Sequence, residues 1–282
     1  MRASAGQRIV NSLRVLFMSL YAAFIFLPFL WMFSNAFKPN DRVMADLTPL
    51  SIWTFLPRPF TMQPVVELFS SGLGRSILVT VAVAGFTIVG GILINSMAGF
   101  SFAKFRFPGK ELLFSLVVVS FLIPFEAIAV PLFVTIQRLG WMNTVYALII
   151  PALANGLCIF MFRQFFMDLP DELVDAALID GAGWTRIYSA LFMPLSKSAC
   201  ITAGFLLFLS QWQAFIWPLL VASSKDLRMV QVLIAYLTKE EFRVFWNKTA
   251  AAGFVVALVP LLVILPFQKY FVRGITMTGI KG

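Results

Sequence analysis

The sequence predicts an all-α polytopic membrane protein with six transmembrane helices and one helix in a cytoplasmic loop. Of its 282 residues, 60% are hydrophobic and only 12% are charged, whereas soluble domains are about 25% charged. Several long runs contain no Asp, Glu, Lys or Arg, and each could cross a hydrocarbon layer of about 30 Å as a helix. Because lipid offers the backbone no hydrogen-bond partner, we expect helices in these runs.

The predicted spans lie at about 15–37, 76–103, 112–137, 139–162, 198–224 and 249–268. These spans define a single transmembrane domain over residues 15–272, between an N-terminal tail at 1–14 and a C-terminal tail at 273–282. An even number of crossings places both termini on the same side. The basic N-terminal tail and the "KFRFPGK" turn at 104–110 favour the cytoplasm, because positive charge gathers in cytoplasmic segments.

The net charge of +9 does not indicate nucleic acid as a partner. The basic residues stand at the ends of apolar runs, where they anchor a helix to lipid headgroups, and they form no basic face. There is no His, and both Cys158 and Cys200 fall in predicted spans, so we expect no metal site, disulfide or His-based catalysis. No phosphate-binding loop occurs either, since Gly109-Lys110 is followed by Glu111. We therefore expect no cofactor on this chain.

The segments between spans contain their own signals. Residues 38–75 are rich in Pro, which predicts an irregular, turn-rich connection. Residues 225–248 lack both Gly and Pro and are compatible with an amphipathic surface helix. Span two ends in a stripe of small or short side chains, which favours close helix packing within the bundle or against a second subunit: Gly91, Asn95, Gly99 and Ala103.

Five acids are concentrated between Asp168 and Asp180, in a chain that has 13 in all. Pro170 suits the first turn of a helix, with Asp168 as its N-cap and acids in the first turn. Gly181 supplies the left-handed conformation that ends a helix. The pattern predicts a short helix over 171–180 followed by a turn. This helix either docks on another protein or is a solvated loop helix that connects spans four and five.

The sequence from Asp175 to Lys197, "DAALIDGAGWTRIYSALFMPLSK", resembles the EAA loop of permease subunits in binding-protein-dependent ABC importers. Asp175 stands where that family usually has Glu, and Met193 where it usually has Leu. The matching positions, which the resemblance implies couple the permease to an ATPase, are Asp175, Ala176, Ala177, Asp180, Gly181, Ala182 and Pro194.

The resemblance extends over most of the chain and is to the carbohydrate branch of these importers. It is carried by "LPFLWMFSNAFKP" (27–39), "AKFRFPGK" (103–110), "IPFEAIAVPLF" (123–133), "LGWMNTVYALIIP" (139–151) and "QKYFVRGITMTGIKG" (268–282). It implies a coupling helix within a loop at 168–188 and a C-terminal tail that reaches the ATPase pair. The implied partners are a cytoplasmic ABC ATPase dimer that uses ATP and Mg²⁺, a second permease that is a different chain, an extracytoplasmic sugar-binding protein, and lipid of the cytoplasmic membrane.

Polar groups within the spans are candidates for the substrate path. Glu126 is the only acid deep in a span, and it lies between Pro124 and Pro131, which predicts an interrupted helix. It either lines the path or pairs internally. Aromatic and amide groups that suit a sugar occur in spans two, four and five, although such residues also serve as core or lipid-facing groups: Asn95, Asn155, Gln211, Trp212, Gln213 and Trp217.

Two other functions compete with a sugar-importer permease. A self-sufficient secondary transporter or channel usually has more spans, inverted repeats or intramembrane ionisable relays. A membrane enzyme would need a polar catalytic cluster, which the absence of His disfavours.

Overall fold

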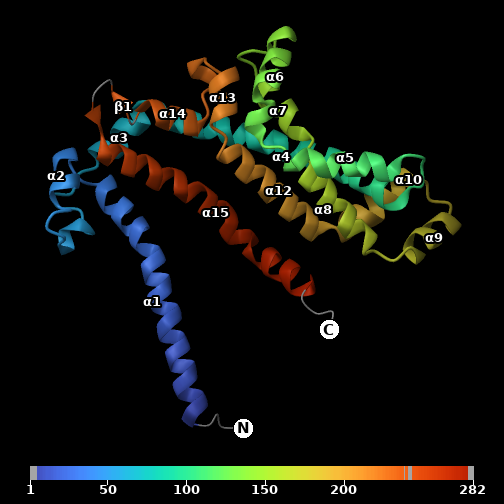
Figure 1. The fold of residues 1–282 in the computed structure, drawn as a ribbon, viewed down its shortest axis with the longest axis horizontal. Helices are drawn as coiled ribbons and strands as arrows, with labels where there is room; N and C mark the ends of the chain where they lie inside the picture. The colour runs from blue at the N-terminus through green and yellow to red at the C-terminus, as the bar shows by residue number, and fades with distance from the viewer. Residues whose placement is uncertain (1–4, 238, 241–242, 279–282) are drawn as a thin grey trace. The chain divides into compact units, whose positions relative to one another are not determined.

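The structure is a computed structural model that describes residues 5–237, 239–240 and 243–278. The chain divides into two units. The first unit comprises Met1–Leu73 and Ile234–Val259, and the second comprises Gly74–Leu233 and Pro260–Gly282. Figure 1 shows the elements along the chain.

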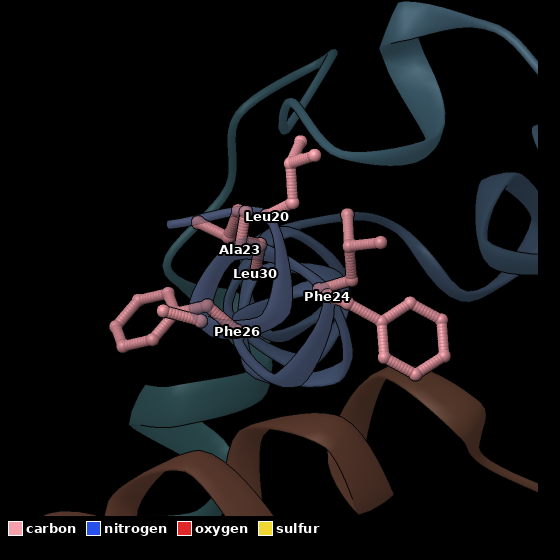
Figure 2. Close-up of a pocket in the computed structure, with 7 residues that line it drawn as sticks. Leu20, Ala23, Phe24, Phe26 and Leu30 are labelled. Carbon is pink, nitrogen blue, oxygen red and sulfur yellow. The ribbon is translucent and has the colours of Figure 1, made fainter. Parts of the chain in front are cut away.

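The first unit begins with α1, Ala5–Ala36, which starts within the predicted N-terminal tail. Figure 2 shows Leu20, Ala23, Phe24, Phe26 and Leu30 on this helix. The hollow beside them is lined by apolar side chains alone, so it offers no group for a polar substrate. The most apolar 18-residue stretch of the span at Val10–Ala36 has no residue buried within the chain, and only Ser34, Asn35 and Ala36 at the end of the span are buried. A helix that is apolar on every side belongs in lipid or against another membrane helix.

The segment after α1 contains only short helices, as its Pro content predicts. They are α2 (Asn40–Ala45), the 3₁₀ turn η1 (Ile52–Thr54) and α3 (Gln63–Ser70). Lys38, which is fully buried, holds this segment together. Its Nζ lies 3.0 Å from Asp46 Oδ2 and also donates to the carbonyl of Trp53.

The first unit also includes β1 (Lys239–Glu240), β2 (Arg243–Val244) and the first part of α15 (Trp246–Thr278). The two strands pair antiparallel, with Lys239 opposite Val244. The surface helix that the sequence suggested over 225–248 is therefore formed only in α14, Val230–Leu237. Beyond α14, Lys239–Glu240 and Arg243–Val244 form strands instead, and Val244 is a β-branched residue of high β-propensity.

In the first unit, Lys248 at the start of α15 forms an ion pair with Glu67 of α3 at 2.9 Å. The hydrogen bond from Lys248, helped by one from Gln63, lowers the pKa of Glu67. A carboxylate with a lowered pKa stabilises the fold above its ordinary pKa and loses that contribution as pH falls through the folded-state value. The ion pair is therefore fully formed at neutral pH.

The second unit is a helical bundle, and Figure 1 shows α9 at one end of it, with α6 and α13 projecting from its upper side. Its elements are α4 (Leu73–Lys104), α5 (Lys110–Leu122), α6 (Phe125–Arg138), α7 (Val145–Leu153), α8 (Gly156–Met167), α9 (Glu172–Ile179), α10 (Trp184–Arg186), the π-helical turn η2 (Ile187–Phe192), α11 (Met193–Leu195), α12 (Lys197–Trp212), α13 (Ile216–Val221), η3 (Lys225–Leu227), the first part of α14 and the last part of α15.

The predicted class, an all-α polytopic membrane protein, is confirmed. Among the described residues, four helical spans are long and apolar enough to cross a membrane: Val10–Ala36, Leu73–Lys104, Val145–Met167 and Trp246–Phe267. Two bent pairs bring the number to six if each pair is one span. They are Lys110–Leu122 with Phe125–Arg138, bent by 102°, and Trp184–Leu195 with Lys197–Trp212, bent by 80°.

Two of these spans differ in position from the apolar runs in the sequence. Span four starts at Val145 because residues 139–144 form a turn, with Gly140 and Asn143 at positive φ. The run at 198–224 is divided between α12 and α13, and the bent pair extends toward residue 184 instead. Pro218 lies in the first turn of α13, where its missing N–H is tolerated.

The small-residue stripe on α4 packs within this chain. A Cβ on Gly99 would lie 2.6 Å from Phe162 Cβ and 2.9 Å from the backbone N of Arg163. A Cβ on Gly91 would approach Leu207 and the carbonyl of Leu153. The absence of side chains at these positions lets α4 lie directly against α8, which is the close approach that such stripes permit.

Candidate functional site

The acidic stretch forms α9, the short helix that the sequence predicts. The helix ends in a Schellman motif at Gly181, whose φ is +75°. The N–H of Ala182 donates to the carbonyl of Ala177 at 2.9 Å, and the N–H of Gly181 donates to that of Leu178 at 3.0 Å. Because only glycine adopts this backbone without strain, the end of α9 is fixed.

The start of α9 differs from the expectation. Asp168 is not its N-cap but the C-cap of α8, with its N–H bonded to the carbonyl of Gln164 at 3.2 Å. Asp171 occupies the N-cap of α9 without a capping bond from its side chain. The reason is a competing partner, because Asp171 Oδ1 lies 2.6 Å from Lys104 Nζ.

One face of α9 packs on the bundle while the other is exposed. Val174 is buried, and Ala177 and Ala182 rest on the same hydrophobic cluster, in which Phe166 and Phe192 are buried. Asp175, Ala176, Asp180 and Gly181 are exposed. Ile179, at the C-terminal end of α9, is 86% exposed. An apolar side chain thus projects from an acidic, water-facing helix.

Aromatic rings support the bundle beneath α9. Phe100 of α4 lies at their centre, with its ring centroid 4.9 Å from that of Phe192 and 5.5 Å from that of Tyr188. Phe105, just beyond α4, contacts Trp184 edge-on at 4.8 Å. Because interiors this well filled transmit displacement rather than absorb it, the cluster is suited to passing a movement of α9 into the spans.

Pro194 is exposed in α11, directly after the π-helical turn η2. A proline lacks the N–H that would bond to the carbonyl four residues earlier, and its ring crowds that carbonyl. Widening of the preceding turn into a π-helix relieves this crowding. The chain then bends at Ser196, which is buried and donates its hydroxyl to the carbonyl of Phe192 at 2.7 Å.

Lys104 is a residue that the sequence analysis did not single out. It ends α4, and its side chain is only 7% exposed. Besides Asp171, its Nζ donates to the carbonyl of Leu169 at 2.9 Å. The hydrogen bond from Lys104 lowers the pKa of Asp171, so this carboxylate stays ionised until pH falls below its ordinary range. The one feature of the sequence that could have indicated this role is a lysine at the end of a span, and such lysines are common.

The predicted interruption of span three is present. α5 ends at Leu122, Ile123 and Pro124 are extended, and α6 begins at Phe125. Glu126 lies in the first turn of α6, where the helix dipole favours a carboxylate. Its side chain is exposed, and no hydrogen bond or ion pair joins it to the residues that the structure describes. The internal pairing considered for Glu126 is therefore not seen there.

Span four is also broken, between α7 and α8, but this break is closed by two asparagines. The fully buried Asn95 of α4 donates to the carbonyl of Leu153 at 2.9 Å and accepts the N–H of Asn155 at 2.8 Å. The side chain of Asn155 in turn accepts the N–H of Cys158 at 3.0 Å, as an N-cap of α8. Backbone groups that lipid could not satisfy thus find partners.

The span-five candidates lie in different environments. Gln211 and Trp212 are buried, and Trp212 stacks on Phe208 with ring centroids 5.7 Å apart. Gln213 is exposed at the end of α12. Trp217 is half-buried; its Nε1 donates to the carbonyl of Ala147 at 2.8 Å, and its ring meets Phe125 at the break in span three. Trp217 and Glu126 are thus near the same break, whereas Asn155 is not joined to it by any contact described.

Fold and site together define a polytopic helical membrane protein with interrupted spans and an ordered polar loop. Residues 91–277 match the model of the binding-protein-dependent transport system inner membrane component family. The chain belongs to this family, the permease subunits of ABC importers, and is thus an integral inner membrane protein. Permease subunits of this family have no ATPase site of their own.

Curated relatives match most of the chain. The arabinooligosaccharides transport system permease protein AraQ of Halalkalibacterium halodurans is 31% identical over 264 residues, covering 90% of this chain and 91% of the relative. The sn-glycerol-3-phosphate transport system permease protein UgpE of Yersinia pestis bv. Antiqua is 31% identical over 230 residues, covering 79% and 82%.

A solved structure shares the fold. A chain from the crystal structure of a bacterial ABC transporter involved in the import of the acidic polysaccharide alginate matches with a TM-score of 0.79. The match covers 96% of this chain and 99% of that chain at 20% identity.

Proposed function

We propose that this chain is one permease half of an ATP-driven importer for a sugar or sugar derivative. A separate ATPase pair binds ATP and Mg²⁺, and its closure moves the loop at 168–188, which switches the spans between outward-facing and inward-facing states. The proposal combines the membership of the chain in the permease family with the geometry of α9.

The observation that carries the coupling role is the exposed tip of α9. Ile179 is 86% exposed on a helix whose neighbours Asp175 and Asp180 are water-facing acids. An apolar side chain displayed by a rigid, acidic knob suits a recess on a soluble partner better than it suits lipid or water. The Schellman end at Gly181 keeps this tip at a fixed angle.

The remaining partners follow from the family and from exposed surfaces. We propose a second, different permease chain as the neighbour of α1, whose residues 10–30 are all exposed. An extracytoplasmic sugar-binding protein would deliver substrate, and both termini would lie in the cytoplasm. The C-terminal tail would contact the ATPase pair, although residues 279–282 lie outside the described part of the chain.

Two named relatives act on different ligands, an arabinooligosaccharide and sn-glycerol-3-phosphate. Both are polyhydroxylated, which points to a sugar or sugar derivative as the class of substrate here. We propose that Glu126 and Gln213 line the path, because both side chains are exposed. Trp217 would support the path beside the break in span three, while Asn155, Gln211 and Trp212 are proposed to contribute mainly by shaping it.

The test is purification from native membranes through an affinity tag on this chain, followed by reconstitution into liposomes. We expect a stoichiometric ATPase and a second permease to co-purify, and uptake to require ATP on the side of the ATPase. Uptake by this chain alone, driven by an ion gradient, would instead establish the secondary-transporter alternative.

Replacing Gly181 by valine tests the coupling step within that assay. The φ of +75° at this position is strained for a β-branched residue, so the tip of α9 should shift. We expect the ATPase to go on hydrolysing ATP while uptake is lost. Coupled uptake at the wild-type level would contradict the mechanism.

A further inference from the structure

Lys104 fastens the start of α9 to the end of α4. The two segments are far apart in sequence, since Asp171 lies 67 residues beyond Lys104. The Lys104 ammonium contacts the Asp171 carboxylate at 2.6 Å, the Leu169 carbonyl at 2.9 Å and the face of the Phe192 ring at 5.5 Å. A single side chain thus touches the connection before α9, the N-cap of α9 and the π-helical turn η2.

The environment of Lys104 indicates that these contacts are fixed. Its side chain is 7% exposed, whereas that of Asp171 is 83% exposed. A lysine removed from water must be compensated by hydrogen bonds and opposite charge. Its partner Leu169 O is a backbone acceptor directly before Pro170, so it cannot move without moving the start of α9. The desolvated lysine thus anchors an otherwise exposed loop.

Apart from the attraction between Arg106 and Asp171, the other described attachments of α9 to the bundle are apolar and non-directional. Val174, Ala177 and Ala182 rest on the hydrophobic cluster, and the small side chains of the two alanines allow a packed helix to slide. The Lys104 ammonium instead makes charge-assisted hydrogen bonds to two specific oxygen atoms of the loop, and such bonds are shorter and stronger than neutral ones. Lys104 therefore resists a sliding motion that the apolar contacts alone would permit.

We propose that Lys104 is a positioning residue for energy coupling: it joins α9 to span two, so that movement of α9 reaches α4 directly as well as spans four and five through the chain. This proposal rests on the proposed function, because it concerns how the coupling loop transmits force. It adds a route into span two that the connectivity of the loop does not supply.

The test compares Lys104→Met, Lys104→Arg and Lys110→Met in the reconstituted complex. Methionine keeps the apolar stem but loses the charge, and arginine keeps the charge and the donors. Lys110 is the matched control, because its Nζ donates at 3.0 Å to the Phe105 carbonyl in the neighbouring turn and does not contact the loop. The readout is substrate taken up per ATP hydrolysed, with co-purification of the ATPase as the measure of assembly.

We expect Lys104→Met to assemble and hydrolyse ATP but to take up about tenfold less substrate per ATP, a change within the range usual for coupling between two sites. Lys104→Arg should recover most of the ratio, and Lys110→Met should keep the wild-type value. A purely structural role would lower assembly and hydrolysis together and leave the ratio unchanged. An unchanged ratio in Lys104→Met, or an equal fall in Lys110→Met, overturns the proposal.

If Lys104→Met does not assemble, Asp171→Asn decides, because this exposed carboxylate lies outside the core. Less substrate taken up per ATP in assembled Asp171→Asn complexes supports the positioning role of Lys104, and a wild-type ratio of uptake to hydrolysis overturns it. The wild-type complex separates this proposal from the proposed function. If the wild-type complex shows no ATP-dependent uptake, the proposed function is wrong. If the wild type takes up substrate and the variants keep the wild-type uptake per ATP, only the proposed role of Lys104 is wrong.

Discussion

Two helix breaks in the second unit are built in opposite ways. In span four, α7 and α8 are separated by Ala154 and Asn155, and Asn95 and Asn155 supply partners for the backbone of the break. In span three, α5 and α6 are separated by Ile123 and Pro124 and bend by 102°, and the nearby Glu126 is exposed. The first break is sealed against another helix, while the second leaves its polar groups accessible.

The difference teaches how to separate structural from functional polar groups in a membrane protein. Unsatisfied backbone groups are tolerated at membrane depth only when protein covers them or a wet cavity reaches them. At the break in span four, protein covers the backbone groups, so a structural role explains the two asparagines there. At the break in span three, the described residues neither cover the backbone groups nor form a wet cavity around them. This favours a water-filled path or a partner subunit at that point.

The largest expected effect on stability comes from replacing Asn95, whose side chain supplies hydrogen bonds to the break in span four. Asn95→Leu leaves the part-buried Leu153 carbonyl and Asn155 N–H without the Asn95 side chain as a partner, and each unsatisfied group costs up to about 1–3 kcal/mol. We expect a marked fall in the thermal midpoint of the purified complex and in its yield. A midpoint equal to the wild type would show that the break in span four does not need Asn95.

The next effect comes from the contact that presses α4 onto α8. Gly99→Ala places a methyl group within 2.6 Å of Phe162 Cβ, against backbone that cannot yield easily, and should destabilise by about 1–3 kcal/mol. Gly85→Ala, in the same helix with nothing within 4 Å, is the matched control and should stabilise by about 0.5–1 kcal/mol. Equal midpoints for the two variants would contradict the close approach of α4 and α8.

A smaller effect is expected from Asn155→Ala. This change removes the cap on Cys158 but keeps the backbone N–H that Asn95 accepts, so the loss should be about 1 kcal/mol. Uptake per ATP should remain near the wild-type value. A strong loss of uptake in a stable complex would instead place Asn155 on the substrate path.

The smallest effect on stability is expected at the open break. Glu126→Gln removes a charge that no described residue pairs with, so stability should change by no more than about 0.5 kcal/mol. Uptake should nevertheless fall several-fold if this carboxylate lines the path. A variant that assembles and transports like the wild type would remove Glu126 from the path and weaken the contrast between the two breaks.

Local signals predicted the open break and the end of α9 from the sequence. Pro124 next to an intramembrane acid indicated the interruption of span three, and Gly181 indicated the left-handed end of α9. Both depend on the backbone preferences of single residues. The helical class followed equally well from runs without charge.

The asparagine hydrogen bonds at the break in span four and the Lys104–Asp171 contact could not be predicted, because they join residues distant in sequence. Asn95 pairs with Leu153 and Asn155, 58 and 60 residues away, and Lys104 pairs with Asp171. The N-cap of α9 was misplaced for the same reason, since Asp171 bonds to Lys104 rather than to its own helix. An asparagine in a span or a lysine at its end has many possible partners, and only the packing of α4 selects them.

The central claim, that force enters this permease at the tip of α9, can be tested by photo-cross-linking in native membranes. A photoreactive residue in place of Ile179 is compared with one in place of Leu50, which is 74% exposed in the segment between α1 and α4. We predict an adduct with a nucleotide-hydrolysing subunit from position 179, changed in yield by ATP, and none from position 50. No such adduct from position 179 during active uptake, or an equal one from position 50, would contradict the account.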